Sequence, residues 1–502
     1  MRRFLGHSNL TIGPRDRPSV AGIMRRETAA NLEPDAIVNP LLPHDALLVV
    51  ERADPDIVLV ETGAMTVGQP WSTAGDPSVG DRGRRLVDIV RAARAIGRPS
   101  VLWWSGPRHK AAGLIPMEPL FDLVVAAGRA GAAPSTPLWS TGVQLARFNP
   151  IGADPMRPCR PVLAARFDAA TPGAWRWPFD VAAIPASDTD IDVWLEFDGY
   201  PHHPRSTELP ADLMPLVKRW FDTDQAPDTY RSNGLFIAEP VDAIRPGEPV
   251  AERTLAQLAS GARIISGPDA SLGVSLSDWV IWADGPGDDI RAATSAGPLA
   301  LSELRPLMRS LSERHSTARA LEGLMRYLGL NATTASGRDV CAVVRLDPTI
   351  RVDRSVDDIL RQRQRPAEVL FVGEPTRDHQ AVIDELRLAR VEVRWMPSGQ
   401  GDRGDLAEAA TRTNAEWLWP MSSVVRYQPE HLLDLMIAAH MSGADAIGWI
   451  GGEIDRFVTE LSFESSIVSR RAATRVPESV IHDLDRWFAG GASLFGVAST
   501  LR

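Results

Sequence analysis

Two pairs of side chains in this 502-residue sequence have the types and spacing of a ligand site. Trp103 and Trp104 close a short apolar run, where an aromatic pair can stack on a sugar or on a base. Tryptophans of this kind more often belong to a hydrophobic core, so both interpretations stay open. Glu239 and Asp242 follow the apolar run 235–237 and are placed to contact a hydroxyl-rich ligand, although solvation in a loop explains them equally well.

Metal-ligating side chains do not form a complete set. His202 and His203 are adjacent in a proline-rich stretch, but a zinc site needs a third ligand, and none stands at helical or hairpin spacing. Only two cysteines occur, Cys159 and Cys341, far apart in the chain. This argues against a disulfide framework and against a cysteine-based zinc site. We therefore expect solvated histidines and no metal.

Alternating strands and helices must position these groups. In the first part of the chain, apolar runs at 57–60 and 101–104 flank a segment at 80–96 with helical period. Such alternation is typical of parallel βαβ units covered on both faces. We therefore expect α/β architecture, with a Rossmann-like lobe over residues 1–155.

The same pattern continues in two further regions. Residues 156–335 are expected to form a second Rossmann-like lobe, in which a helix at 252–260 ends at Gly261. A long helix is expected at 301–328. Residues 336–502 again alternate short apolar runs with helical segments and are expected to form a third α/β domain.

Several stretches follow one another in the order of a known family. Pro55–Glu61 reads PDIVLVE, Leu120–Val125 reads LFDLVV, and Arg253–Gly261 reads RTLAQLASG. In the last third, Tyr427–Leu435 reads YQPEHLLDL and Ser442–Gly448 reads SGADAIG. The chain resembles bacterial proteins that join a CgeB-like (spore-maturation-type) glycosyltransferase to a family-2-type glycosyltransferase domain.

The resemblance implies a fold and an activity. It implies a GT-B-like pair of Rossmann-like lobes, residues 1–155 and 156–335, followed by a GT-A-like domain at 336–502. The implied reaction moves a sugar from a nucleotide-diphosphate donor to a glycan, lipid-linked or protein acceptor, with the GT-B cleft as the working site. Arg253 would neutralise the diphosphate, and Gly261 would let the backbone approach the ligand closely.

Acidic residues of the family are missing from this sequence. Ala256 stands where relatives have a ribose-binding glutamate, and Trp103-Trp104-Ser105-Gly106-Pro107 replaces the polar WNKEDP. Trp419-Pro420-Met421-Ser422-Ser423 replaces the metal-binding aspartate run, and serines are poor sole ligands for Mg²⁺ or Mn²⁺. We therefore expect no divalent metal and no cofactor besides the donor.

The general base of the GT-A-like domain is also altered. Relatives carry a Glu-Asp pair where this sequence has His482-Asp483. Asp483 would take the acceptor's proton, with His482 beside it. An N-cap role for Asp483, before a helix near residue 484, is the alternative.

These losses leave two functions open. One is the glycosyltransferase described above, and the other is an inactive pseudo-glycosyltransferase that acts as a scaffold or regulatory partner of an active one. A formal net charge of −10 argues against nucleic-acid binding. No apolar run has the length of a signal peptide or a membrane span, so a cytoplasmic protein is expected. The donor sugar, acceptor, anomeric outcome and oligomeric state stay open.

Overall fold

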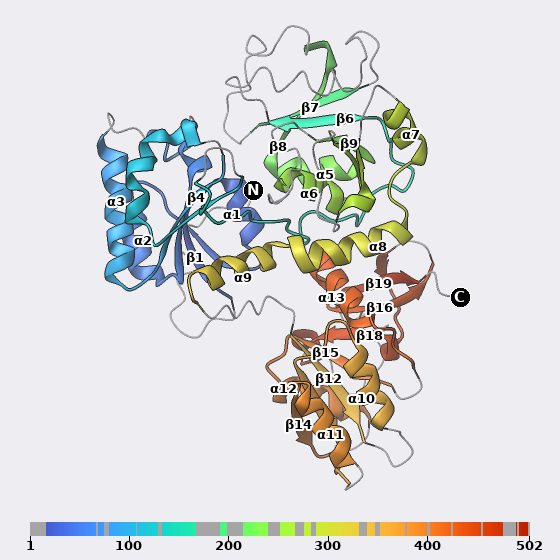
Figure 1. Cartoon of the computed structure of the whole chain (residues 1–502). Coiled ribbons are helices and arrows are strands. Elements are labelled where there is room, and N and C mark those ends of the chain that lie inside the picture. The colour runs from blue at the N-terminus through green and yellow to red at the C-terminus, as the bar shows by residue number, and fades with distance from the viewer. Residues whose placement is uncertain are drawn as a thin grey trace. The chain divides into compact units, whose positions relative to one another are not determined.

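The chain forms two compact units, Met1–Ser336 (unit 1) and Gly337–Arg502 (unit 2) (Figure 1). The computed structural model describes residues 17–66, 69–74, 80–106, 108–128, 133–166, 191–197, 214–238, 251–266, 276–282, 288–330, 339–346, 352–376, 379–398, 402–422, 425–452, 455–474, 488 and 491–499. No described helix has both the length and the apolar character needed to cross a bilayer.

The first sheet of unit 1 has the strand order β2-β1-β3-β4-β5, and all its neighbours pair in parallel. Its strands are β1 (Ser19–Ile23), β2 (Ile37–Pro40), β3 (Ile57–Glu61), β4 (Ser100–Trp104) and β5 (Leu123–Ala126). The helices among them are α1 (Arg26–Leu32), α2 (Ala46–Ala53), α3 (Gly80–Ala95) and the 3₁₀ segments η1 (Thr62–Met65) and η2 (Arg108–Leu120).

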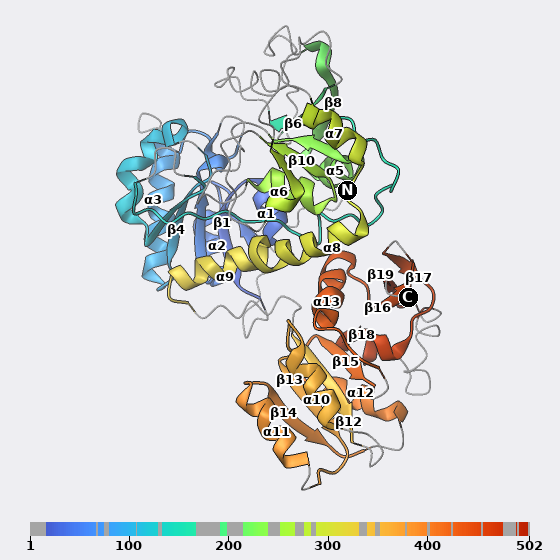
Figure 2. The same cartoon turned by 45° about the vertical axis from the view of Figure 1, so that its right-hand side comes forward.

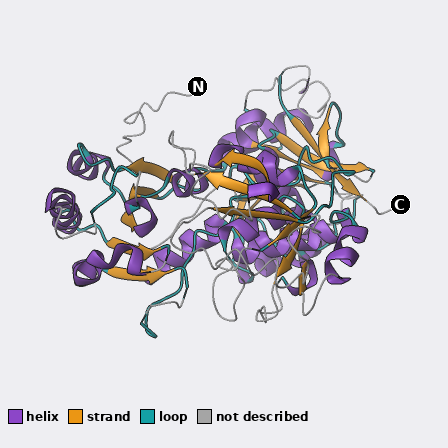
Figure 3. Ribbon diagram, turned by 90° about the horizontal axis from the view of Figure 1, so that it is seen from above, coloured by secondary structure: helices purple, strands orange, loops and turns teal. Residues whose placement is uncertain are grey.

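Helices cover both faces of this sheet (Figure 3). Successive strand residues point to opposite faces, so Val58 packs in one cluster with residues of α2 and α3. Its neighbours Ile57 and Leu59 pack instead with residues of α1 and α9 (Thr317–Tyr327). The expected α/β class with buried parallel strands is confirmed for this part of the chain.

The second sheet of unit 1 is also parallel, with the order β11-β10-β9-β6-β7-β8. Its strands are β6 (Val162–Arg166), β7 (Asp192–Phe197), β8 (Val217–Asp222), β9 (Leu235–Ile237), β10 (Arg263–Ser266) and β11 (Val280–Trp282). Its helices are α5 (Ala226–Arg231), α6 (Glu252–Ala259), α7 (Asp288–Ala296) and the 3₁₀ segments η5 (Met214–Leu216), η6 (Thr223–Gln225) and η8 (Ser277–Trp279).

The expectation of one continuous helix over 301–328 is wrong. The segment divides into α8 (Leu301–Ser310), a π-helical turn (Leu311–His315) and α9, and it breaks at Ser316, which has extended backbone. Val143 pairs with the chain at the break: its N–H donates to the His315 carbonyl at 2.8 Å, and its carbonyl accepts from the Thr317 N–H at 3.1 Å. After this break α9 lies against the first sheet (Figures 1 and 2).

Unit 2 contains one mixed sheet with the order β14-β13-β12-β15-β18-β16-β19-β17, in which β18 is antiparallel to β15 and β16, and β17 to β19. Its strands are β12 (Val340–Arg345), β13 (Glu368–Val372), β14 (Glu392–Met396), β15 (Trp417–Met421), β16 (Ala446–Gly451), β17 (Arg456–Val458), β18 (Ser466–Ser469) and β19 (Leu494–Ser499). Its helices are α10 (Val352–Arg361), α11 (His379–Leu388), α12 (Asp402–Arg412), α13 (His431–Ser442), α14 (Arg470–Ala473) and the 3₁₀ turn η10 (Phe463–Ser465).

Candidate functional site

The strand orders of unit 1 mark two places where a ligand can bind. In open parallel sheets, ligands bind beyond the carboxyl ends of the strands, where the strand order reverses. The first sheet reverses between β1 and β3, and the second between β6 and β9. Polar side chains just beyond these strand ends are therefore the candidates for ligand binding in unit 1.

Arg25 and Glu61 lie at the reversal point of the first sheet. Arg25 follows β1 by two residues, and Glu61 is the last residue of β3. The Arg25 backbone N–H donates to Glu61 Oε2 at 2.8 Å, and its guanidinium Nε donates to Oε1. The Glu61 side chain is fully buried, so the arginine compensates a carboxylate that water cannot reach.

The turn after β3 completes this cluster with backbone groups. The Gly63 N–H donates to Ser105 Oγ at 3.0 Å, and the Ser105 N–H donates to Thr62 Oγ1 at 3.1 Å. A Cβ at Gly63 would lie 2.8 Å from Arg25 Nε and from Glu61 Oε1. Only glycine therefore fits beside the arginine–glutamate pair.

Glu252, the first residue of α6, brings the second-sheet part of unit 1 to the same cluster. Its Oε1 accepts hydrogen bonds from Thr141 N at 3.1 Å and from Thr141 Oγ1 at 2.5 Å. Burial raises the pKa of Glu252 to about 7; Arg25 opposes the shift, and the charges of Glu27 and Glu61 add to it. A carboxyl group with this pKa can gain or lose a proton near neutral pH.

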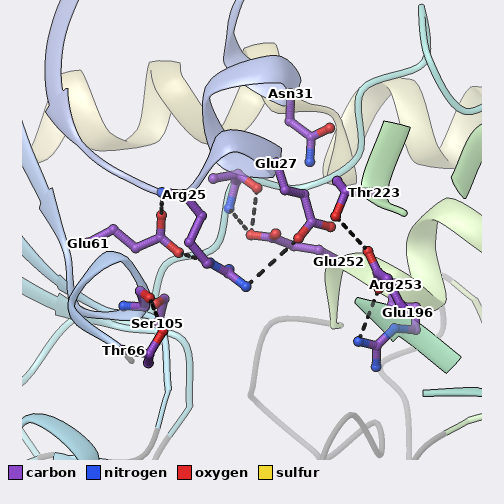
Figure 4. A network of polar contacts seen from close by, with 12 residues as sticks. Arg25, Glu27, Asn31, Glu61, Thr66, Ser105, Glu196, Thr223, Glu252 and Arg253 are labelled. Atoms are coloured by element: carbon purple, nitrogen blue, oxygen red, sulfur yellow. Dashed lines mark hydrogen bonds and ion pairs between the residues drawn. The ribbon is translucent and has the colours of Figure 1, made fainter. Parts of the chain in front are cut away.

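Arg253 follows Glu252 on α6 and points to the carboxyl end of β7. Its Nη2 lies 3.5 Å from Oε2 of Glu196, and the two side chains are 13% and 2% exposed. Glu196 Oε1 also accepts a hydrogen bond from Thr223 Oγ1 at 3.2 Å. Figure 4 shows this pair beside the Arg25–Glu61 and Glu252 contacts, within one polar network.

Direct contacts join the two sheet-bearing parts of unit 1 around this network. Arg26 forms an ion pair with Asp224 of η6. Arg147 donates to Asn31 Oδ1 at 2.6 Å and to the Thr223 carbonyl at 3.5 Å. We call the network of Arg25, Glu27, Glu61, Glu196, Glu252 and Arg253 the carboxyl-edge cluster.

Of the described residues that the sequence predicts to bind the donor, Arg253 alone lies in this cluster. Trp103 and Trp104 are 1% and 2% exposed, which agrees with the core interpretation and leaves almost no ring surface for a ligand to stack on. Trp103 packs edge-on against Trp139 at 4.9 Å, and Trp104 Nε1 donates to Glu118 Oε1 at 2.8 Å. Both tryptophans belong to the core of unit 1.

Gly261 is a turn residue between α6 and β10. Its φ of +82° lies in the left-handed region that favours glycine. Its carbonyl accepts from Arg157 Nη2 at 2.5 Å, and a Cβ would lie 2.8 Å from that atom and 3.2 Å from Leu304 Cδ2. The side chains of Arg157 and Leu304 therefore occupy the space beside Gly261 where a ligand was expected.

The remaining expected site residues lie outside the described residues. They are Glu239, His482 and Asp483, together with His202, His203, Asp242 and Ser423. In the described part of the chain, no three His, Cys, Asp or Glu side chains are grouped as a metal site requires.

Trp419–Ser422, the described part of the segment that the resemblance aligns with an aspartate run, lies on and just after β15. Trp419 is fully buried and packs edge-on against Tyr427 at 4.9 Å. The Tyr427 hydroxyl accepts from the Ser422 N–H and donates to the Glu464 carbonyl, both at 2.9 Å. Burial lowers the pKa of His431, which contacts the same rings, to about 4, so this histidine is neutral. Tyr427 and His431 thus pack against the end of β15, and the Tyr427 hydroxyl bonds to the residue that follows this strand.

Five members of the cluster were not predicted from the sequence: Arg25, Glu27, Glu61, Glu196 and Glu252. A signal for two of them was present, because Arg25 and Glu61 are charged residues directly beyond or at the end of apolar strands. The charged residue beyond a buried strand is the pattern that would have found them. Glu252 carries no such signal, since it begins a helix like many glutamates.

Comparisons with known proteins give weak likenesses. No family model and no curated protein matches the chain. Among solved structures, HepE of Anabaena in complex with UDP and glucose is 13% identical, covering 62% of this chain and 99% of that one at a TM-score of 0.40. A Pyrobaculum calidifontis mannosyltransferase with GDP-Man and Mn²⁺ is 11% identical, covering 32% and 57% at 0.26. S. aureus TarS 1-349 is 14% identical, covering 32% and 58% at 0.25.

This chain thus spans a little more than half the length of two of these three structures. At TM-scores of this size, the likenesses do not decide between one α/β architecture and another. The strand orders and the contacts of the carboxyl-edge cluster are observed in this chain and do not depend on these likenesses.

Proposed function

We propose that unit 1 is a GT-B-like glycosyltransferase that binds a nucleotide-diphosphate sugar at the carboxyl-edge cluster. The main support for this proposal is that charged side chains from the ends of both parallel sheets lie together in one polar network. The second sheet has the dinucleotide-binding strand order, 3-2-1-4-5-6 when its strands are numbered along the chain. The RTLAQLASG stretch that resembles CgeB-like enzymes includes Arg253 of this cluster.

Each group has a task in the proposed reaction. Arg253 forms an ion pair with the diphosphate in place of Glu196, because a guanidinium can donate two parallel hydrogen bonds to phosphate oxygens. Glu252 accepts the proton of the acceptor hydroxyl, whose oxygen then bonds to the sugar carbon as the nucleoside diphosphate leaves. The roles of Arg253 and Glu252 are the same for a glycan, a lipid-linked or a protein acceptor.

Nucleotide binding tests this proposal. We expect UDP, GDP or one of their sugar conjugates to raise the melting temperature of the full chain, with or without Mn²⁺. Arg253→Ala should abolish the shift, whereas Arg231→Ala on α5, where the arginine pairs with Asp228, should keep it. A shift that only Asp483→Ala removes would place the donor in unit 2 and contradict the proposal.

The pseudo-glycosyltransferase is the competing function. It is favoured by the carboxylate-free sequence Trp419 to Ser422 and by the engagement of Arg253 with Glu196. If none of the nucleotides and nucleotide sugars shifts the melting temperature, this alternative holds and the enzyme proposal fails.

A further inference from the structure

A cavity of about 730 Å³ lies on unit 2. It is lined by the end of β16, by all of β17 and by the loop that follows it, residues 459–462. Its volume falls in the range of ~300–1,000 Å³ that is usual for small-molecule sites. Figure 2 shows β16, β17 and β19 together in this part of the sheet.

An exposed aromatic ring forms one wall of the cavity. Phe457 of β17 is 55% exposed, which is unusual for a phenylalanine in a strand. Its ring rests edge-on against the buried ring of Phe495 at 5.2 Å and 78°. The packing against Phe495 orients a ring that remains open to a ligand.

The residues that line the cavity differ in burial, and the apolar side chains other than that of Phe457 are less exposed than the polar ones. Val458 and Leu461 are half-buried and pack against the core of unit 2. Arg456, Thr459, Glu460 and Ser462 are exposed and line the same cavity. In the part of the chain that the structure describes, no ion pair or side-chain hydrogen bond engages Arg456 or Glu460. A hydrogen-bond donor, Arg456, and a hydrogen-bond acceptor, Glu460, are thus available beside the ring of Phe457.

Hydrogen bonds between side-chain and backbone atoms fix both ends of the segment that lines this cavity. The Ala498 N–H of β19 donates to Asp455 Oδ1 at 2.7 Å, directly before β17 begins. The Ser462 carbonyl accepts from Ser466 Oγ at 2.6 Å, so the far end of the loop is also fixed. A preformed site of this kind loses little conformational entropy when a ligand binds.

From this arrangement we infer that the Phe457 cavity of unit 2 binds a neutral saccharide. A pyranose ring presents an apolar C–H face that can cover the phenylalanine, while its hydroxyls can bond to Arg456 and Glu460. The opposite charges of these two residues give no net attraction for a nucleoside diphosphate. The three-residue strand β17 is a short edge that offers little backbone to an added peptide strand. The inference does not depend on a donor site in unit 1.

A glycan array and titration calorimetry with the full chain test this inference. The probes are neutral oligosaccharides of glucose, galactose, mannose and N-acetylglucosamine. We expect at least one to bind, Phe457→Ala to weaken its binding about tenfold, and Glu460→Gln and Arg456→Ala to weaken it by a similar factor without affecting the fold. Leu388→Ala, at an 85% exposed position on α11, is the control and should bind as the wild type does.

Four results would overturn the inference, and the first three concern oligosaccharide binding and self-association. They are the absence of binding by every neutral oligosaccharide, binding that survives both Phe457→Ala and Glu460→Gln, and self-association of the chain that Phe457→Ala abolishes. The last result, measured by light scattering, would show that the exposed ring contacts a second copy. Binding of UDP at this cavity, lost in Arg456→Ala, would likewise contradict a neutral ligand.

Discussion

Glu252 is the residue whose ionisation the structure changes most clearly within the carboxyl-edge cluster. Burial raises its pKa from 4.5 to about 7, against the attraction of Arg25. Because the folded state binds this proton more tightly than the unfolded chain does, the stabilising contribution is complete below pH 4.5. It decreases as the pH rises and is lost above about 7.

Glu252→Gln should therefore remove this part of the pH dependence. The amide oxygen can still accept from Thr141, but it carries no charge to bury. We expect the variant to be more stable than the wild type at pH 8 by about 1–2 kcal/mol, allowing for the partial exposure of Glu252, and nearly equal at pH 4.5. Urea unfolding at both pH values measures the difference, and an equal stability gap at both would refute the assignment.

At the scale of elements, the turn from α6 to β10 depends on Gly261. Gly297, which also has a positive φ, is a matched control, since a Cβ there would meet no atom within 4 Å. Alanine at Gly297 should cost about 1–2 kcal/mol for the backbone alone. Alanine at Gly261 should cost at least about 1 kcal/mol more, because Arg157 and Leu304 must also move. If both alanine variants lose the same unfolding free energy in denaturant, Arg157 and Leu304 move aside without an energetic cost.

The elements themselves were largely predictable from the sequence, whereas the cluster was not. Apolar runs alternating with helical segments indicate parallel strands regardless of strand order. The contacts of the cluster depend on that order, since they join Arg25 to Glu61 and Thr141 to Glu252, which are 36 and 111 positions apart. Trp103 and Trp104 stayed ambiguous because a strand covered on both faces shows no polar–apolar alternation.

At the scale of the whole molecule, unit 2 should fold without unit 1. It has its own sheet and its own core, which includes Cys341, Leu370 and Leu418. Residues 337–502 expressed alone should unfold in one cooperative transition. Its midpoint should lie within about 4 °C of the corresponding transition in the full chain, the shift that ~1 kcal/mol gives at this size. A fragment without near-ultraviolet circular dichroism would contradict this division.

Hydrogen–deuterium exchange of the full chain with saturating nucleotide shows whether the carboxyl-edge cluster binds the donor. UDP, GDP, UDP-glucose and GDP-mannose are the ligands. If the carboxyl-edge cluster holds the donor, one of them will slow exchange at residues 25–29 and 252–256, and Arg253→Ala will remove this protection. Protection confined to unit 2, or no protection with any of the four, would contradict the account.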